Sequence, residues 1–227
     1  GTRPSVFGAE QGNAGDLRVW NYTNFLMTNC GVRTKANNAG ASTMIAINME
    51  FVSQVPMLDN LMIGVNTPLQ TMTNPTGGNS IGINLPPVNN HAWINIGKVY
   101  ISGYETGINA TEHTYIDHCL ILGCVNGIKL QAANHASHFN MTTMEHVKHN
   151  IVVNGNHPLS IGMYETEHNG SISWATHAQD ILVNSGTRKI AILRASVVIP
   201  GTGYVEGSNF LSNDPTIYKI VAGTGAN

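Results

Sequence analysis

Thr106-Gly107-Ile108 and Asn126-Gly127-Ile128 are copies of one short phrase, in which Gly, Asn or Asp precedes an aliphatic residue. The other copies along the chain are Cys30-Gly31-Val32, Asp59-Asn60-Leu61, Ile81-Gly82-Ile83, His149-Asn150-Ile151 and Gln179-Asp180-Ile181. Gly, Asn and Asp tolerate the left-handed backbone of a tight corner. Because the copies recur every 20 to 30 residues, each leading into a strand pattern, they indicate a solenoid.

A second pattern lies upstream of these corners. An apolar residue, a small polar residue and a third, mostly apolar residue occur at Ile47-Asn48-Met49, Ile94-Asn95-Ile96, Ile116-Asp117-His118, Phe139-Asn140-Met141 and Ile172-Ser173-Trp174. Alternation with period two places the outer residues of each triplet on one face of a strand and the polar residue on the other. We therefore expect His118 in an inward apolar column, and an outward polar column of Asn48, Asn95, Asp117, Asn140 and Ser173.

The two patterns together predict an all-β protein, a right-handed single-stranded parallel β-helix of about seven rungs with protruding loops. We expect a lead-in or cap over residues 1–24, the β-helix over 25–200, and C-terminal strands of the same domain over 201–227. Turn-forming residues predict loops at 67–90, with one returning strand near Ile81, and at 154–170.

Composition narrows the class of protein. Only 11% of the 227 residues are charged, while 42% are hydrophobic, which excludes a disordered chain. The net charge of −2 and the lack of a long basic run argue against nucleic acid as a partner. No apolar stretch is long enough for a membrane span, so we expect no membrane insertion. The opening Gly1-Thr2-Arg3-Pro4 has neither an initiator Met nor a signal-peptide pattern, which indicates a processed chain or a fragment.

The three cysteines, Cys30, Cys119 and Cys124, cannot all pair within the chain. Free thiols packed as small hydrophobic groups are one interpretation. A Cys119–Cys124 disulfide is the other, and it requires the intervening residues to fold back sharply.

The few acidic residues limit where acid–base chemistry can occur. Glycoside cleavage requires two carboxyl groups about 5–10 Å apart, and neighbouring rungs of a β-helix are about 4.8 Å apart. Acids on one face of successive rungs can therefore meet that requirement. Asp117, Glu145 and Glu165 are the catalytic candidates if the protein is an enzyme.

All ten histidines lie between His91 and His177. Two pairs are spaced at i and i+3, His135 with His138 and His146 with His149, a spacing that can bind zinc on a turn. On a strand the two side chains of each pair face opposite sides, so surface residues on turns are the alternative interpretation. No motif in the chain predicts a cofactor or a dedicated metal site.

One stretch resembles a known group of proteins. Tyr115-Ile116-Asp117-His118-Cys119, followed by Asn126-Gly127-Ile128, is similar to a rung of the pectate-lyase-like β-helix superfamily. The chain lacks the Arg-x-Pro-x-x-Arg string that lyases of that group use. Its composition, rich in Asn, Thr and Gly and poor in charge, looks like the β-helix shafts of bacteriophage tailspikes and appendages.

This resemblance implies a structural and recognition module on a virion surface or in the extracellular space. It implies a homotrimer that contacts other virion or appendage proteins and binds cell-surface polysaccharide. The aromatic residues expected to stack on sugars are Trp93, Tyr104, Tyr164 and Trp174. The alternative is a polysaccharide lyase or glycoside hydrolase that uses surface carboxylates.

Overall fold

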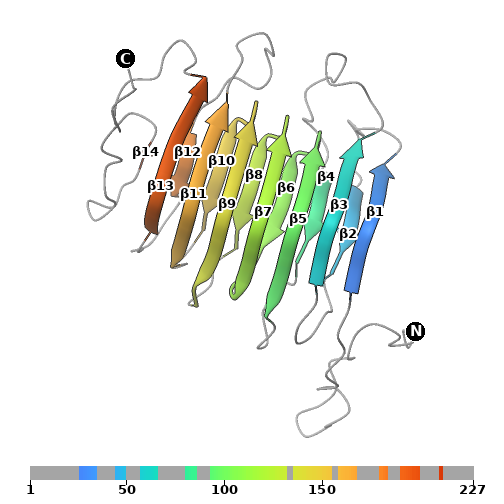
Figure 1. The fold of residues 1–227 in the computed structure, drawn as a ribbon. Coiled ribbons are helices and arrows are strands. Elements are labelled where there is room, and N and C mark those ends of the chain that lie inside the picture. The colour runs from blue at the N-terminus through green and yellow to red at the C-terminus, as the bar shows by residue number, and fades with distance from the viewer. Residues whose placement is uncertain are drawn as a thin grey trace, which may run out of the picture.

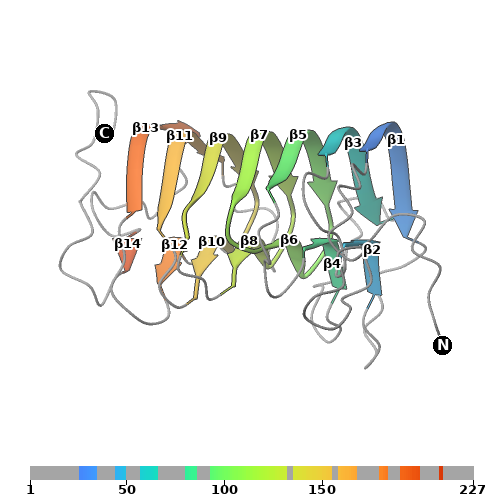
Figure 2. The same ribbon diagram turned by 90° about the horizontal axis from the view of Figure 1, so that it is seen from below.

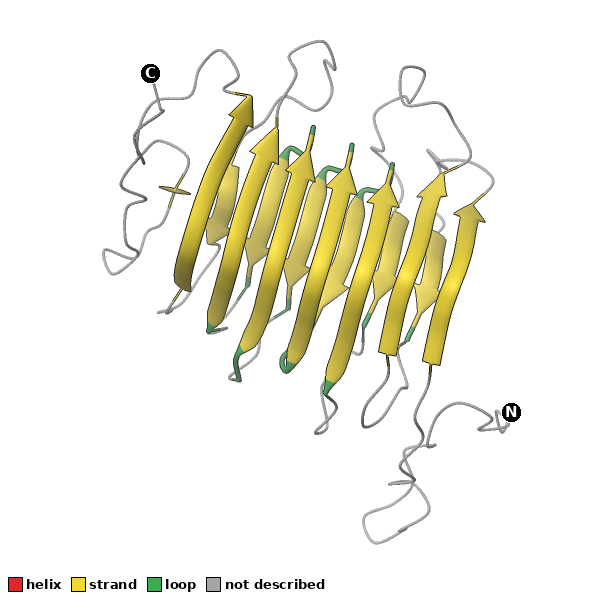
Figure 3. Ribbon diagram, viewed as in Figure 1, coloured by secondary structure: helices red, strands yellow, loops and turns green. Residues whose placement is uncertain are grey.

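In the computed structural model of the protein, the described residues are 26–34, 44–49, 57–65, 80–85, 93–131, 135–154, 158–167, 179–183, 190–199 and 210–211. Over these residues the chain forms fourteen β-strands and no helix (Figure 3). This part of the chain accordingly has no helix that is long and apolar enough to cross a membrane.

The odd-numbered strands form one sheet, which we call the long-strand sheet. Its seven strands follow the order β1-β3-β5-β7-β9-β11-β13, and every pair is parallel. Their bounds are β1 (Leu26–Thr34), β3 (Met57–Val65), β5 (Ile94–Ser102), β7 (Thr114–Leu122), β9 (Ser137–Glu145), β11 (Leu159–Glu167) and β13 (Ile190–Ile199).

The even-numbered strands form a second parallel sheet, the short-strand sheet, in the order β2-β4-β6-β8-β10-β12-β14. Their bounds are β2 (Met44–Asn48), β4 (Ser80–Asn84), β6 (Thr106–Ala110), β8 (Asn126–Leu130), β10 (His149–Val153), β12 (Gln179–Val183) and β14 (Phe210–Leu211). The last of these strands lies in the segment 201–227.

Successive strands of the chain belong to opposite sheets, and the two sheets lie one over the other (Figures 1 and 2). Each passage through the long-strand sheet is followed by one through the short-strand sheet. Parallel strands that alternate between two stacked sheets are compatible with a parallel β-solenoid. The prediction of an all-β, parallel-stranded protein is therefore confirmed.

Aliphatic side chains stack between the sheets. In the short-strand sheet one column of isoleucines runs through six neighbouring strands, each at most 8% exposed: Ile47, Ile83, Ile108, Ile128, Ile151 and Ile181. Ile96, Ile116, Phe139 and Ile161 form a matching column in the long-strand sheet, and all four are fully buried. Burying such side chains contributes about 1.5–3 kcal/mol each relative to exposure, so these columns hold the two sheets together.

Five of the long strands, β3, β5, β7, β9 and β11, bend near their middles. In β5, Ile94 and Ile96 are buried and so are Val99 and Ile101, whereas the residues at 97 and 98 are more exposed. Strict alternation would place one of two consecutive residues inside, so this change of phase marks a bend. The same pattern recurs in β7, β9 and β11. The bend divides each of these strands into two halves that face different directions.

The bend explains an error in the sequence interpretation. We expected His118 inside, but its side chain is exposed. It occupies the second outward position of the bend in β7, between Lys98 of β5 and Met141 of β9. Period-two alternation cannot generate two consecutive outward residues, so the prediction for His118 was wrong.

Most of the expected corners lie inside strands. Gly82, Gly107, Gly127, Asn150 and Asp180 occupy equivalent, buried positions in successive short strands, and none of them has a positive φ. Crowding explains the three glycines. A Cβ on Gly107, for example, would lie 2.7 Å from the carbonyl oxygen of Gly127. The prediction of left-handed corners at these five positions was wrong.

The left-handed positions occur elsewhere. Gly103, Gly123 and His146 have φ of 82°, 62° and 53°, and each directly follows a long strand. These residues turn the chain toward the next short strand. Asn60, where a left-handed backbone was expected, does have a positive φ of 51°, but it lies within β3, at the bend.

The expected outward polar column is correct at only one step. Asp117 and Asn140 lie beside each other in β7 and β9, and Nδ2 of Asn140 donates to Oδ1 of Asp117 at 2.9 Å. Asn95 was expected beside Asp117, but it pairs with Tyr115, two positions earlier in β7. Ser173 lies outside the described residues.

Asn48, also expected in that column, belongs to the other sheet. It begins a ladder in which Nδ2 of Asn84 donates to Oδ1 of Asn48 at 2.9 Å, and Nδ2 of Asn109 donates to Oδ1 of Asn84 at 2.8 Å. Stacked amides of this kind satisfy polar groups along the short-strand sheet without charge, which agrees with the low charge of the chain.

The two expected loops differ in outcome. Within 67–90 a strand does return near Ile81, as predicted, and it is β4. The stretch 154–170, by contrast, is largely strand, because β11 occupies Leu159–Glu167. Pro158 directly precedes this strand and Gly162 lies at its bend, so residues that signal turns in the sequence mark features of a strand here.

Candidate functional site

Aromatic and imidazole rings gather where β5, β7 and β9 begin. Trp93 directly precedes β5, Glu112 and His113 form the turn before β7, and His135 lies two residues before β9. Because these strands are neighbours and parallel, their starting ends share one edge of the sheet. Residues about twenty positions apart in the sequence therefore become adjacent on the surface.

Three of these rings form a continuous stack. The centroids of Trp93 and His113 are 6.0 Å apart with the rings 17° from parallel, and those of His113 and His135 are 4.8 Å apart at 18°. Trp93 is 66% exposed, the most exposed large hydrophobic residue among those described. Its indole therefore presents a flat apolar surface to solvent, supported from one side by imidazole.

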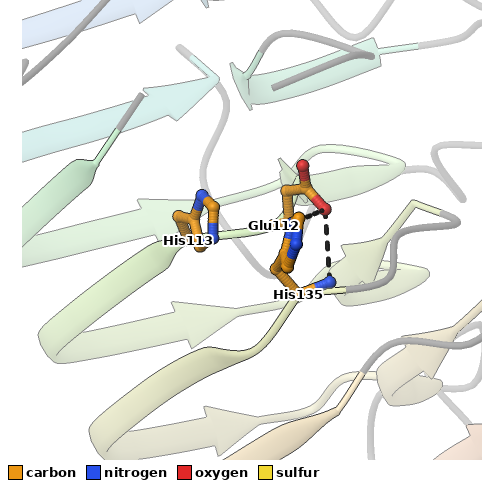
Figure 4. A group of neighbouring side chains, drawn as sticks. All are labelled: Glu112, His113 and His135. Atoms are coloured by element: carbon orange, nitrogen blue, oxygen red, sulfur yellow. Dashed lines mark hydrogen bonds and ion pairs between the residues drawn. The ribbon is translucent and has the colours of Figure 1, made fainter. Parts of the chain in front are cut away.

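Glu112 lies at the edge of this stack (Figure 4). Its Oε2 accepts a hydrogen bond from the backbone N–H of His135 at 3.2 Å and lies 3.0 Å from Nδ1 of the same residue. The side chain of Glu112 is only 15% exposed, whereas that of His135 is 61% exposed. The carboxylate thus anchors the backbone and the ring of His135 at once.

A second pair of rings continues the surface toward β11. Tyr115 and His138 are partners across β7 and β9, with centroids 5.5 Å apart and rings 22° from parallel. Nδ1 of His138 is hydrogen-bonded to Oγ of Ser160 at 2.6 Å, which fixes the imidazole. We call the five rings the aromatic strip; its members are Trp93, His113, Tyr115, His135 and His138.

Of the four aromatic residues expected to stack on sugars, the structure exposes Trp93. Tyr104 is fully buried, with its hydroxyl 3.1 Å from Oγ1 of Thr34, and burial raises the pKa of its phenol. Tyr164 is 2% exposed and lies between the sheets. Neither buried ring can reach a ligand, so both are corrected to core residues. Trp174 lies outside the described residues.

The candidate carboxylates are not all neighbours. Glu145 pairs with Leu122, which lies five positions beyond Asp117 on β7 and on the other side of the bend. The carboxylates of Asp117 and Glu145 therefore face different directions and cannot act as a pair on one bond. The hydrogen bond from Asn140 gives Asp117 a structural role.

A different acidic group forms at the other end of the long strands. Glu145 and Glu167 are partners across β9 and β11, and Glu165 lies two positions away on β11. Burial, and next the charges of Glu167 and Glu165, raise the pKa of Glu145. Burial lowers the pKa of His146, which follows β9, while Glu167 opposes that shift. Oε2 of Glu165 accepts a hydrogen bond from Oγ1 of Thr143 at 3.2 Å.

The four histidines considered for a metal site do not converge. His135 and His138 lie at the start of β9, whereas His146 and His149 follow its end. The nine-residue strand β9 lies between the two pairs and separates them by at most about 30 Å along its length. The structure instead brings His135, which precedes β9, next to the Glu112-His113 dipeptide, which precedes the neighbouring strand β7. The register between neighbouring strands creates this neighbourhood, and no local motif in the sequence signals it.

Comparison with known proteins finds no match. No protein-family model matches the chain, no curated protein matches it, and no solved structure matches it. The functional interpretation therefore rests on the residues and their geometry.

Proposed function

We propose that the protein is a right-handed parallel β-helix of about seven turns that recognises carbohydrate through its aromatic strip. The observation that carries this proposal is the exposed indole of Trp93, 66% accessible and stacked on His113 across neighbouring strands. Large exposed aromatic residues at a built surface mark interaction sites more often than isolated apolar residues do.

Carbohydrate is the ligand class that fits this surface best. A sugar ring has an apolar face that packs against an aromatic ring, and hydroxyl groups around it that require hydrogen-bonding partners. The strip supplies both, because the rings of Trp93 and Tyr115 are flanked by imidazoles and by the Glu112 carboxylate. Its stacked rings are 4.8–6.0 Å apart, which follows from the spacing of neighbouring strands and suits a polymer lying across the strands.

Nucleic acid bases also stack on aromatic rings, but they come with phosphates that require basic side chains. The chain has a net charge of −2 and no long basic run. A neutral or weakly charged polysaccharide on a cell surface is therefore the favoured partner. This role agrees with a location on a virion or in the extracellular space.

Glycan binding by the intact protein tests the proposal. We expect binding to at least one polysaccharide on a glycan array, and loss of that binding in Trp93→Ala. Leu26→Ala is the matched control, because Leu26 is 63% exposed but lies outside the aromatic strip. Absence of binding across the array, or binding that is equal in wild type and Trp93→Ala, would reject the strip as the recognition surface.

Self-association is part of this proposal. Met62 is 55% exposed and, with Tyr100 and Leu120, forms an outward column on β3, β5 and β7. We propose that this column lies in a homotrimer interface, or against another virion or appendage protein. Analytical ultracentrifugation of wild type and of Met62→Glu tests the trimer: the variant should dissociate, and a monomeric wild type would contradict it.

A second function, glycoside hydrolysis or polysaccharide cleavage, is favoured by a separate observation. Burial, and next the charges of Glu167 and Glu165, raise the pKa of Glu145, and a carboxyl with a raised pKa beside a second carboxylate is the arrangement that general acid catalysis uses. In this case Glu145→Gln should abolish depolymerisation of the bound polysaccharide while binding persists. Product formation unchanged by that substitution would dismiss the second function.

A further inference from the structure

One cluster in the described part of the chain combines the ligand types of a transition-metal site. Glu112, His113 and His135 each offer one ligand atom, and these atoms all lie within 4.8 Å of one another (Figure 4). Two imidazoles and one carboxylate are a donor set that suits Zn²⁺ and related divalent ions, with water completing the coordination. Hard ions such as Ca²⁺ and Mg²⁺ prefer oxygen ligands alone.

One distance within the cluster is already close to that required, and the ligand atoms are at most 4.8 Å apart. Tetrahedral zinc, with ligands at about 2.0–2.1 Å, places its ligand atoms about 3.3 Å apart. Oε2 of Glu112 and Nδ1 of His135 are already 3.0 Å apart. The remaining adjustment is a tilt of the imidazoles, because nitrogen lone pairs lie in the ring plane and the two rings are stacked at 18°. The ring of His135, which is 61% exposed, has room to turn.

A second observation concerns His113. Its Nδ1 is buried and has no hydrogen-bond partner among the described residues. A buried polar atom without a partner costs about 1–3 kcal/mol, so most such atoms in folded proteins have one. A bound cation would complete the contacts of this imidazole, which the protein alone leaves incomplete.

The backbone holds His113 in an unusual conformation as well. Its φ is 57°, a left-handed value that is uncommon for any residue other than glycine. The turn of Glu112 and His113 is tied into the sheet, because the His113 N–H donates to the carbonyl of Ala136 and its own carbonyl accepts from Ile94. The backbone that carries these two ligands is therefore fixed before any ion binds.

We propose that Glu112, His113 and His135 bind one divalent transition-metal ion of the zinc class beside Trp93. The site joins the turn before β7 to the segment before β9, and so links two neighbouring strands at the edge of the aromatic strip. The ion replaces the side-chain contact between Oε2 of Glu112 and Nδ1 of His135, while the hydrogen bond from the His135 backbone N–H to Glu112 remains. This inference stands apart from carbohydrate recognition, since metal binding is measured without any glycan.

Titration calorimetry with ZnCl₂ on the metal-stripped protein is the primary test. We expect one ion per chain. We expect the zinc affinity to fall by about tenfold or more, relative to wild type, in each of His135→Gln, Glu112→Gln and His113→Asn. Asn is chosen at position 113 because it tolerates a left-handed backbone. His118→Gln is the matched control, since His118 is an exposed histidine at the bend of β7, outside the cluster, and its affinity should equal that of wild type.

Trp93 provides a second, local measurement. Its ring centroid lies 6.0 Å from that of His113, so Cu²⁺ bound at the site should quench its fluorescence. The quenched fraction should disappear in Trp93→Phe and in His135→Gln. Retained zinc affinity in all three ligand variants would overturn the proposal, and so would the absence of zinc binding at about 1 mM. If His113→Asn fails to fold, His135→Gln and Glu112→Gln still decide the outcome.

Discussion

Nδ2 of Asn150 donates a hydrogen bond to Oδ1 of Asp180 at 2.9 Å, across neighbouring short strands and in the interior between the sheets. Tyr164 of β11 donates its hydroxyl to the same carboxylate oxygen at 2.8 Å, and Asn150 also donates to Oγ1 of Thr166 at 3.0 Å. All four residues are at most 4% exposed. This buried polar network joins the two sheets at the point where the glycines of the short strands give way to larger residues.

Tyr164→Phe should therefore lower the free energy of unfolding by about 1–2 kcal/mol, because it removes a hydrogen bond from a buried carboxylate. Urea denaturation measures the change. Tyr104→Phe is the control: its hydroxyl contacts Thr34 in a partly buried position, and we expect a smaller loss of about 0.5–1 kcal/mol. Equal losses in the two variants would show that the buried network contributes no more to the free energy of unfolding than the hydrogen bond between Tyr104 and Thr34 does.

Gly107→Ala should destabilise the fold by about 1–3 kcal/mol, because the added methyl group overpacks the space between β6 and β8. It would lie 2.7 Å from the carbonyl oxygen of Gly127 and 3.0 Å from Cγ2 of Ile121. Gly31→Ala is the control, since the nearest atom to its new Cβ is 3.7 Å away. Thermal denaturation should separate the two variants. A Gly107→Ala protein as stable as wild type would disprove the crowding.

Glu145→Gln should stabilise the protein at pH 7. The raised pKa of Glu145 means that the folded state loses stability as pH rises from 4.5, the carboxyl's ordinary value, through the raised value. Relief of the cross-strand repulsion from Glu167 should contribute about 0.2–1 kcal/mol, and the gain should vanish below pH 4.5. Urea denaturation at several pH values measures this. In the double variant Glu145→Gln/Glu167→Gln, the stability gains of the two single variants should not add. Full additivity would exclude repulsion between Glu145 and Glu167.

Cys119 and Cys124 should resist thiol reagents in the folded protein. All three cysteines are free, as one of the two sequence interpretations expected, and burial raises the pKa of Cys119 and Cys124 to about 12. The thiolate is the reactive form. Cys30 is only half-buried, so one thiol should react with Ellman's reagent at pH 8, and all three in urea. Cys30→Ser should abolish the native reaction; rapid modification of a second thiol would contradict the packing.

The repeat in the sequence predicted the class of fold because it reflects a local rule. The isoleucines that follow each Gly, Asn or Asp do align, from Ile83 to Ile181, and their spacing shows where each short strand begins. For Gly107 and Gly127, however, the predicted left-handed corner was wrong, because both glycines lie in crowded strands. Glycine suits both a left-handed turn and a crowded strand, and the sequence alone does not distinguish these two causes.

The candidate site was only partly visible in the sequence. Trp93 was expected at the surface and is there, but Tyr104 and Tyr164 were expected with it and are buried. His113 and Tyr115 were not proposed at all. Their roles depend on which residues of neighbouring strands face each other, and the sequence alignment of those strands was wrong by two positions at Asn95.

The sequence by itself determined that the chain alternates apolar and polar residues in repeated short strands, because period-two burial and a recurrent spacing are properties of the chain. Only the tertiary structure decided where the long strands bend, and therefore that His118 faces solvent. It also decided that Trp93, His113 and His135 form one stack. These residues lie twenty or so positions apart, and a shift of one residue in strand register turns a side chain to the opposite face.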